Sequence, residues 1–432
     1  MLSLVGLGLP GGGAAVAQAP PSLVDFGPPR LEDTTNSAGW WTPIVEHGGA
    51  TYFAYDAPGR TARTHAVWVV KRLASGRTAS SCLSLSGAGG GCHEFTDDIG
   101  HHEPSIAVDG GGYVHVFTDL HESPWSQHYF RSAAPESVTT FAERSSTMPD
   151  PTWANTYPVL ARAPGGDLWL AIRSHSSPGA AGFGGRLYHY DRATQRWSRA
   201  VTFAYNAGLW AYPDDLQVDA TGRVHIAFEW VKKKTSAFPH IGDYVTFDPA
   251  TGRLANAAGE TLTGPLTVNS PAVYQAWSSS YDPAAARNGY GVQTAKLALD
   301  PTTGRPQIVY RYTPRYGLHL AVLRVEWDGT VWRRTTVYGG KYDTFPAVDV
   351  TVHGSSNRFY YVKVNPSGGP SAFVAELTPS GTYTEHSLAP ARPKIERLSA
   401  ISRADGTDVV YLSAPRARAP LAGELYVGSL AR

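Results

Sequence analysis

Net charge is nearly absent from this chain of 432 residues: 37 Lys and Arg face 36 Asp and Glu, for a formal charge of +1. Such a balance creates no global field that would recruit a polyanion. No basic face is seen beyond the short run Lys232–Lys234, so the sequence argues against a nucleic-acid-binding protein. An anionic partner would have to be met by a local cluster of charges.

Long hydrophobic runs are also missing. The apolar stretch at the N-terminus has roughly eight apolar or glycine residues before Pro10, which is too short to span a membrane. It is followed by Ala15-Val16-Ala17, a small-residue pattern typical of a cleavage site, although no positively charged residues precede it. We expect residues 1–19 to be a secretory signal peptide, the protein to be secreted, and no membrane to be a partner.

Cysteine is scarce. Cys82 and Cys92 are the two in the chain, and they flank a glycine-rich loop. Two cysteines close in sequence, in a chain expected to be exported, predict one disulfide. The alternative is a pair of thiolate ligands to a metal ion.

No stretch has the pattern of a long amphipathic helix. Instead, one phrase returns seven times: an extended segment, a Gly/Asp turn and a second, aromatic-rich strand. The copies carry, at one equivalent position, Pro43, Pro104, Pro158, Pro213, Ala295, Pro346 and Leu398. A spacing of about fifty residues, with 45 Gly, 32 Pro, 23 Tyr and 12 Trp, indicates propeller blades. We therefore predict an all-β protein, a single seven-bladed β-propeller over residues 20–432, monomeric, with insertions at 75–95 and 236–290.

The blade geometry predicts which residues meet. In a propeller the first strand of each blade runs along the channel and the second returns antiparallel, so the start of one and the end of the other share a rim. The residues expected at this rim are His101, His102, His121, Tyr157, Arg173, Tyr212, Lys232, Arg311 and Lys363. The opposite rim carries Gly/Asp turns with no chemistry implied. His115 and His225, in mid-strand, are expected to be core residues.

These residue types suit β-elimination across a uronic acid. An arginine neutralises the carboxylate through its planar, permanently charged fork. A base then removes the C5 proton and an acid protonates the departing 4-oxygen, which His and Tyr side chains can do. Glycoside hydrolysis would instead require two carboxylates at a set separation.

The segments HHEPSIAVDGGGYVHVFTDLH and TYPVLARAPGGDLWLAIR resemble the seven-bladed propeller polysaccharide lyases, which comprise the ulvan lyases and related rhamnosyl-glucuronate lyases. In that group a His-x-x-Pro opens one blade, a second His follows one hairpin later, and a Tyr-Pro and an Arg frame the next blade. The resemblance implies that Tyr157 is the catalytic acid/base, that His101 shares this role, and that Arg173 neutralises the uronate. His121 would bind substrate or tune its neighbours, and His102 competes with His101 for the catalytic position.

The resemblance further implies substrate contacts from Tyr212, Lys232 and Arg311, and an anionic polysaccharide as the partner. No cofactor is required for the chemistry, and a structural Ca²⁺ or Zn²⁺ ion is left open without named ligands. Two other classes stay open. One is a sialidase-like propeller hydrolase, disfavoured because no Ser-x-Asp-x-Gly-x-x-Trp box is found. The other is a carbohydrate-binding propeller without catalysis.

Overall fold

The computed structural model describes residues 22–25, 41–62, 64–85, 90–96, 104–118, 128–175, 182–232, 239–276, 290–313, 318–365, 369–378, 380–389, 394–415 and 423–431. Strands dominate this part of the chain, with a short 3-10 helix, η2 (Ser145–Thr147). No helix in these ranges is long and apolar enough to cross a membrane. The predicted signal peptide at 1–19 lies outside the described residues.

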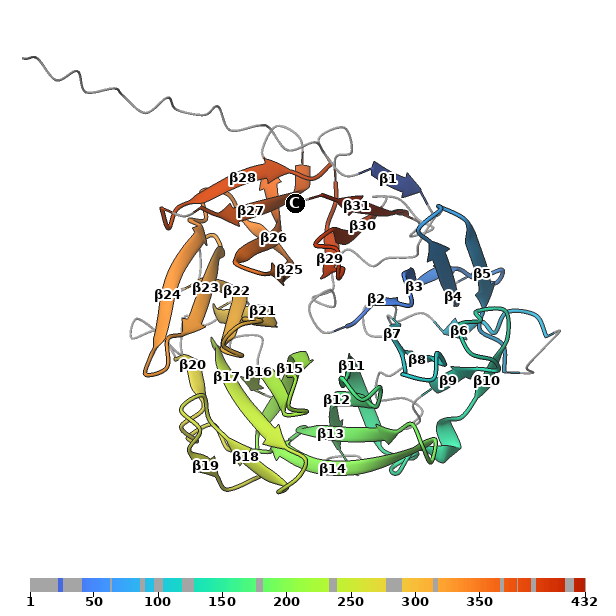
Figure 1. Ribbon diagram of the computed structural model, residues 1–432, viewed down its shortest axis with the longest axis horizontal. Helices are drawn as coiled ribbons and strands as arrows, with labels where there is room; N and C mark the ends of the chain where they lie inside the picture. The colour runs from blue at the N-terminus through green and yellow to red at the C-terminus, as the bar shows by residue number, and fades with distance from the viewer. Residues whose placement is uncertain are drawn as a thin grey trace, which may run out of the picture.

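The described strands form six hydrogen-bonded sheets that stand in a ring, each with its edge toward the centre (Figure 1). The first three sheets contain β2 (Ile44–His47), β3 (Ala50–Pro58), β4 (Thr64–Leu73), β5 (Thr78–Cys82) and β6 (Phe95–Thr96); β7 (Ser105–Val108), β8 (Val114–Thr118), β9 (His128–Ser132) and β10 (Phe141–Glu143); and β11 (Ala154–Arg162), β12 (Leu168–His175), β13 (Gly184–Asp191) and β14 (Arg196–Ala204).

The fourth sheet is the largest. Its strands are β15 (Leu209–Val218), β16 (Val224–Lys232), β17 (Pro239–Asp248), β18 (Arg253–Ala255), β19 (Thr261–Leu262), β20 (Val273–Gln275), β21 (Tyr290–Leu299), β22 (Pro306–Thr313), β23 (Ala321–Trp327) and β24 (Trp332–Tyr338). It consists of two antiparallel parts that meet through a short parallel contact between β17 and β21.

The last two sheets contain β25 (Thr344–His353), β26 (Ser356–Asn365), β27 (Gly369–Leu377) and β28 (Tyr383–Ser387); and β29 (Arg397–Ser402), β30 (Asp408–Pro415), β31 (Gly423–Leu430) and β1 (Ser22–Asp25). The first described strand thus pairs antiparallel with the last, which covers an otherwise open sheet edge (Figure 1).

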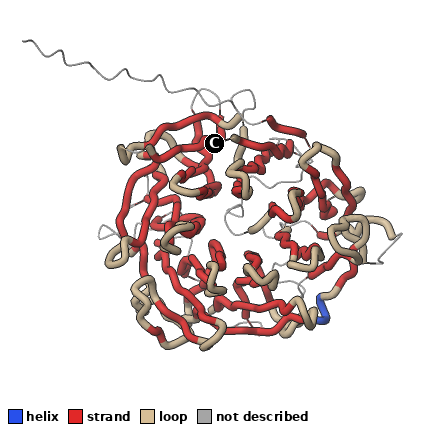
Figure 2. The backbone as a smooth tube through the Cα atoms, in the orientation of Figure 1, coloured by secondary structure: helices blue, strands red, loops and turns tan. Residues whose placement is uncertain are grey.

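Each of the seven predicted hairpins is present as an antiparallel pair, from β2/β3 to β29/β30. The inner strands are buried along nearly their whole length, on both faces, because every sheet packs against two neighbours. One hydrophobic core joins the first two sheets, and another joins the last sheet to the first through Ile44, Phe53, Val409 and Val427. Figure 2 shows that strands make up most of the described backbone of the ring and that loops and turns join them.

The expected insertions are partly wrong. The segment 75–95 includes β5, a strand of the first sheet, and the segment 236–290 includes β17, the third strand of its sheet. Sequence spacing alone does not distinguish an outer strand from an insertion. Cys82, at the end of β5, forms a disulfide with Cys92. This confirms the predicted bond, and the alternative of two thiolate metal ligands is wrong.

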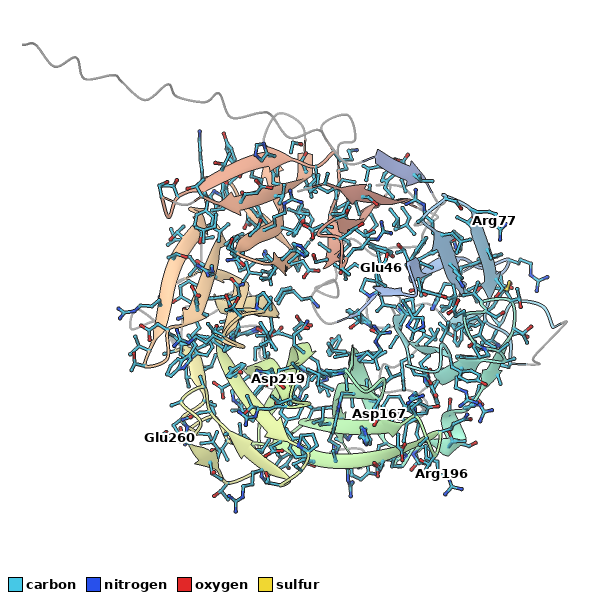
Figure 3. All side chains as sticks on the ribbon, in the orientation of Figure 1. Glu46, Arg77, Asp167, Arg196, Asp219 and Glu260 are labelled. Atoms are coloured by element: carbon cyan, nitrogen blue, oxygen red, sulfur yellow. A yellow bond between two sulfur atoms is a disulfide. The ribbon has the colours of Figure 1, made fainter. Side chains whose placement is uncertain are left out.

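A repeated polar network stabilises the turn side of the ring. His115 is fully buried between Asp109 (3.3 Å) and the hydroxyl of Tyr129 (2.8 Å). His225 repeats the arrangement, with Asp219 at 3.2 Å. Both histidines are core residues as expected, and burial lowers the pKa of each. Figure 3 shows the turn aspartates Asp167 and Asp219 nearer the centre than the peripheral charges Arg196 and Glu260.

Candidate functional site

Tyr157 lies at the start of β11, where the strand leaves its regular pairing. The ladder with β12 holds as far as the pair Thr156 and Arg173 and then shifts register before Val159. Tyr157 has a φ of 61°, a conformation that disfavours a bulky side chain by about 1–2 kcal/mol. The bulge turns this tyrosine out of the ladder, and Pro158, which has no N–H, tolerates the missing hydrogen bond.

The guanidinium of Arg173 lies among four aromatic rings. Its Cζ atom is 4.6 Å from the ring centroid of Tyr157, 4.7 Å from Phe183, 4.9 Å from Trp210 and 4.5 Å from Tyr212. Arg173 is only 1% exposed, and a desolvated cation over an aromatic face is stabilised by about 2 kcal/mol or more. These five residues are called the arginine cage below.

The cage continues into an aromatic cluster of Trp41, Tyr157 and Tyr212, all buried. The indole of Trp41 meets the ring of Tyr157 edge to face at 5.2 Å, and the rings of Tyr157 and Tyr212 are 5.0 Å apart. Trp41 precedes β2, Tyr157 is in β11 and Tyr212 is in β15. Three sheets therefore contribute to one cluster, and the prediction that Tyr157, Arg173 and Tyr212 meet at one rim is confirmed.

The next two hairpins, β15/β16 and β21/β22, place different residues at the position of Arg173. Arg173 pairs with Thr156, Glu229 pairs with Tyr212, and Arg311 pairs with Gln293. Three charged side chains thus occupy the same place on successive second strands. Because all three are buried, each must find its own partners.

Arg311 finds them on the neighbouring sheet. Its Nε donates to Thr344 Oγ1 at 2.9 Å, and its Nη2 donates to the carbonyl of the same residue. Burial lowers the pKa of Arg311 to about 10. These bonds tie β22 to the start of β25, so the predicted contact of Arg311 with substrate stays a prediction.

Glu229 forms a buried pair with His240. Its Oε2 lies 2.9 Å from Nδ1 of the imidazole. Burial raises the pKa of Glu229 well above its usual range and lowers the pKa of His240 to about 3, although a hydrogen bond to the backbone of Val292 opposes the second shift. Both directions favour the neutral forms of the carboxyl group and the imidazole. Sequence reasoning missed this pair, whose members come from the adjacent strands β16 and β17.

Four of the predicted site residues are not tested by this geometry. His101, His102 and His121 lie outside the described residues, and Lys232 ends β16 with its side chain outside the description. Their roles stay predictions.

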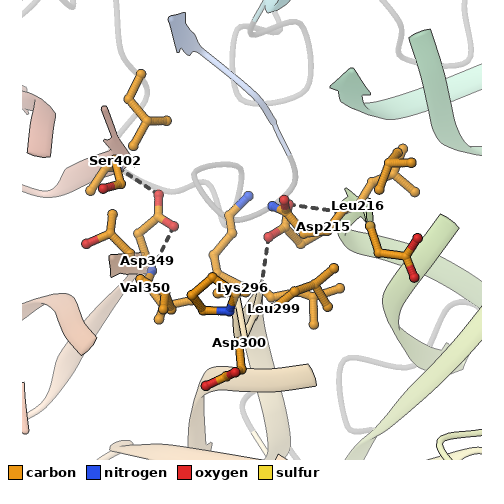
Figure 4. A pocket seen from close by; sticks show the side chains of 18 of the residues that line it. Asp215, Leu216, Lys296, Leu299, Asp300, Asp349, Val350 and Ser402 are labelled. Atoms are coloured by element: carbon orange, nitrogen blue, oxygen red, sulfur yellow. Dashed lines mark hydrogen bonds between the residues drawn. The ribbon is translucent and has the colours of Figure 1, made fainter. Parts of the chain in front are cut away.

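A cavity of about 840 Å³ lies among the innermost strands, beneath the aromatic cluster. Trp41 lines it, as do Asp215 on β15, Lys296 on β21 and Asp349 on β25, and Figure 4 shows Lys296 extending between the two aspartates. Asp215 accepts the amide of Leu297 at 2.8 Å, which links β15 to β21.

Asp349 plays the same linking role one sheet further on. It accepts the amide of Ala400 at 2.7 Å and the hydroxyl of Ser399 at 2.9 Å. Burial raises the pKa of Asp349 to about 6, while the nearby Lys296 opposes the shift. A lone lysine in the apolar strand TAKLALD was the signal in the sequence that could have led to this cluster.

Within the described residues no group of His, Cys, Asp or Glu side chains is arranged to hold a metal ion. The site is therefore built from an arginine, aromatic rings and neutral or paired acids. Such an arrangement can bind a negatively charged group and exchange protons through a tyrosine hydroxyl.

Comparison with known proteins adds a family. Residues 47–338 match the BNR repeat-containing family, and the chain belongs to it. An ulvan lyase of polysaccharide lyase family 25, solved bound to -[GlcA(1-4)Rha3S]-, has a TM-score of 0.66 at 14% identity, over 94% of this chain and 95% of that one. The polysaccharide lyase Uly1 has a TM-score of 0.67 at 14% identity, over 96% and 100%. These likenesses show a shared propeller-like fold. No curated protein matches the sequence.

Proposed function

We propose that this protein is a secreted polysaccharide lyase whose sheets form the seven blades of one propeller. It cleaves the bond at O4 of a uronic acid by β-elimination, with a rhamnose–glucuronate glycan as the preferred substrate class. The observation that carries the proposal is the arginine cage, which places a buried cation against the ring of Tyr157 at 4.6 Å. The fold shared with ulvan lyases over nearly the whole chain supports it.

In this reaction Arg173 neutralises the uronate carboxylate, which makes the C5 proton acidic. Tyr157, together with His101, removes that proton and protonates the leaving 4-oxygen. The cation beside the phenol ring also stabilises negative charge on the tyrosine oxygen while the proton moves. Because Arg173 is 1% exposed, contact with the carboxylate requires a ring of the cage to move aside when substrate binds.

Other predicted site residues contact the rest of the substrate. His102, His121, Tyr212 and Lys232 hold the flanking sugars of an anionic polysaccharide, and the chemistry needs no cofactor. The disulfide between Cys82 and Cys92 fits an exported enzyme, because such bonds persist in oxidising compartments.

The test is the ultraviolet absorbance of the conjugated 4,5-unsaturated uronate, followed on a panel of rhamnose–glucuronate polysaccharides with wild type and Tyr157→Phe. We expect the wild type to produce the chromophore and the variant to lose it. Reducing ends released without the chromophore would mean hydrolysis, and binding without turnover would mean a lectin. A chromophore that persists in Tyr157→Phe would leave a lyase with a different acid/base.

A further inference from the structure

Lys296 joins three distant parts of the chain beneath the aromatic cluster. It lies on β21 and is 5% exposed. Its Nζ donates to the carbonyl oxygen of Trp41 at 3.2 Å and to that of Asp214 at 3.4 Å. A buried ammonium is stable only where carbonyl or carboxylate oxygens surround it. The bond to Trp41 spans 255 positions of sequence, so it exists only in the folded ring.

The charged groups around this ammonium are two aspartates that line the cavity. Asp215 and Asp349 both feel Lys296 as an opposing charge, and Figure 4 shows the lysine between them. Each aspartate also accepts a backbone amide of another inner strand, Leu297 on β21 or Ala400 on β29. The ammonium therefore lies between two fixed carboxylates, in a position from which it reaches the Trp41 carbonyl.

Trp41 occupies the boundary between the cavity and the reacting rim. It is 2% exposed, lines the cavity on one side and meets Tyr157 edge to face on the other. Within the described residues its indole Nε1 has no hydrogen-bond partner. The ring is thus oriented by packing and by the backbone that Lys296 holds, and not by its own N–H.

Tyr157 depends on such contacts more than an ordinary strand residue does. The register shift removes it from the ladder, and its φ of 61° is a strained conformation. Strained backbone of this kind persists only where surrounding contacts hold it. Trp41 is the contact that comes from outside the two sheets that form the arginine cage.

We propose that Lys296 and Trp41 are positioning residues for Tyr157: the ammonium holds the Trp41 backbone, and the indole edge fixes the phenol ring for proton transfer. This rests on the proposed elimination reaction. Neither residue contacts the reacting atoms in this scheme. A misplacement of a catalytic group by about 1 Å lowers the rate by as much as a hundredfold, so a support of this kind affects kcat and leaves KM nearly unchanged.

The test compares Lys296→Met, Trp41→Phe and the control Ser402→Ala, which changes another residue lining the same cavity. Kinetics are measured well below each variant's melting temperature. We expect Lys296→Met and Trp41→Phe to lower kcat by about tenfold to a hundredfold with KM within a factor of about two. Ser402→Ala should match wild type, and Lys296→Arg should recover part of the loss. Unchanged kcat in Trp41→Phe would overturn the proposal, even if Lys296→Met failed to fold.

The failure of this inference is distinguishable from failure of the proposed function. If the wild type shows no elimination on any polymer, the proposed lyase activity is refuted. The crystal structure of Lys296→Met would then test separately whether Lys296 and Trp41 position Tyr157. A displaced Trp41 backbone with a reoriented Tyr157 ring would sustain it. Both residues in their original positions would refute it.

Discussion

Arg173 and Arg311 occupy the same position on the second strands β12 and β22, yet they have opposite surroundings. Arg173 is enclosed by four aromatic rings. Arg311 donates to the side chain and carbonyl of Thr344 on the next sheet. Aromatic faces stabilise the first guanidinium mainly through its positive charge, whereas the second is held by directed hydrogen bonds to protein oxygens. The position of an arginine in the repeat therefore does not determine its role. The residues that surround it do.

Replacing Arg173 tests the comparison most strongly. Arg173→Met keeps the apolar stem inside the cage but removes the cation. We expect kcat for elimination to fall by about 10²–10³-fold, the range seen when one stabilising donor is removed from an active site. The measurement is the initial rate of chromophore formation, with circular dichroism to show that the fold is retained. A variant of near wild-type activity would contradict the assignment of Arg173.

Arg311→Met is the matched substitution of the second arginine in this comparison. It leaves the buried Thr344 carbonyl without this donor, which costs about 1–3 kcal/mol. We expect a lower melting temperature in calorimetry and a much smaller effect on kcat than in Arg173→Met. The reverse outcome, lost activity at an unchanged melting temperature, would make Arg311 the substrate contact that the sequence predicts.

Asp243 provides a test of how burial of a carboxyl group makes the stability of the fold depend on pH. It is fully buried, and its Oδ2 accepts the indole N–H of Trp230 at 2.9 Å. Burial raises the pKa of Asp243 from 3.8 to about 8. The folded protein thus holds this proton where the unfolded chain has lost it. The stability from this proton is fully present below about pH 3.8 and is lost as the pH rises through 8.

We expect Asp243→Asn to flatten that decline, because an amide oxygen still accepts from Trp230 but does not titrate. The difference in unfolding free energy between pH 5 and pH 8 should shrink by at least about 1.4 kcal/mol, the value of one pKa unit. Urea unfolding at the two pH values measures it. An equally steep decline in the variant would show that another group is responsible.

The smallest expected effect comes from the closing strand. β1 pairs with β31 through four residues, and Leu23 packs against the core of the last two sheets. Deleting residues 1–26 should lower the melting temperature by a few degrees, roughly 1–2 kcal/mol in a domain of this size. Activity should persist, because the strand lies far along the sheet from the reacting rim. An unchanged melting temperature would show that the pairing contributes nothing.

Much of the fold was predictable because it depends on local patterns. The seven hairpins follow from a repeated pattern of two extended segments joined by a Gly/Asp turn, and the disulfide follows from two cysteines ten positions apart. The meeting of Tyr157, Arg173 and Tyr212 also followed, because antiparallel pairing brings a strand's start beside its partner's end. The outer strands within 75–95 and 236–290 were mistaken for insertions, since spacing does not reveal pairing.

By itself, then, the sequence determined the repeat, the hairpins and the meeting of Tyr157, Arg173 and Tyr212, because these depend on strand pairing within and between consecutive hairpins. Only the tertiary structure decided which charge faces which partner: rings from two sheets around Arg173, Thr344 against Arg311, His240 beside Glu229, and Lys296 beneath Trp41. The physical reason is that a buried charge takes its properties from groups brought close by the closed ring, many of them far apart in the chain.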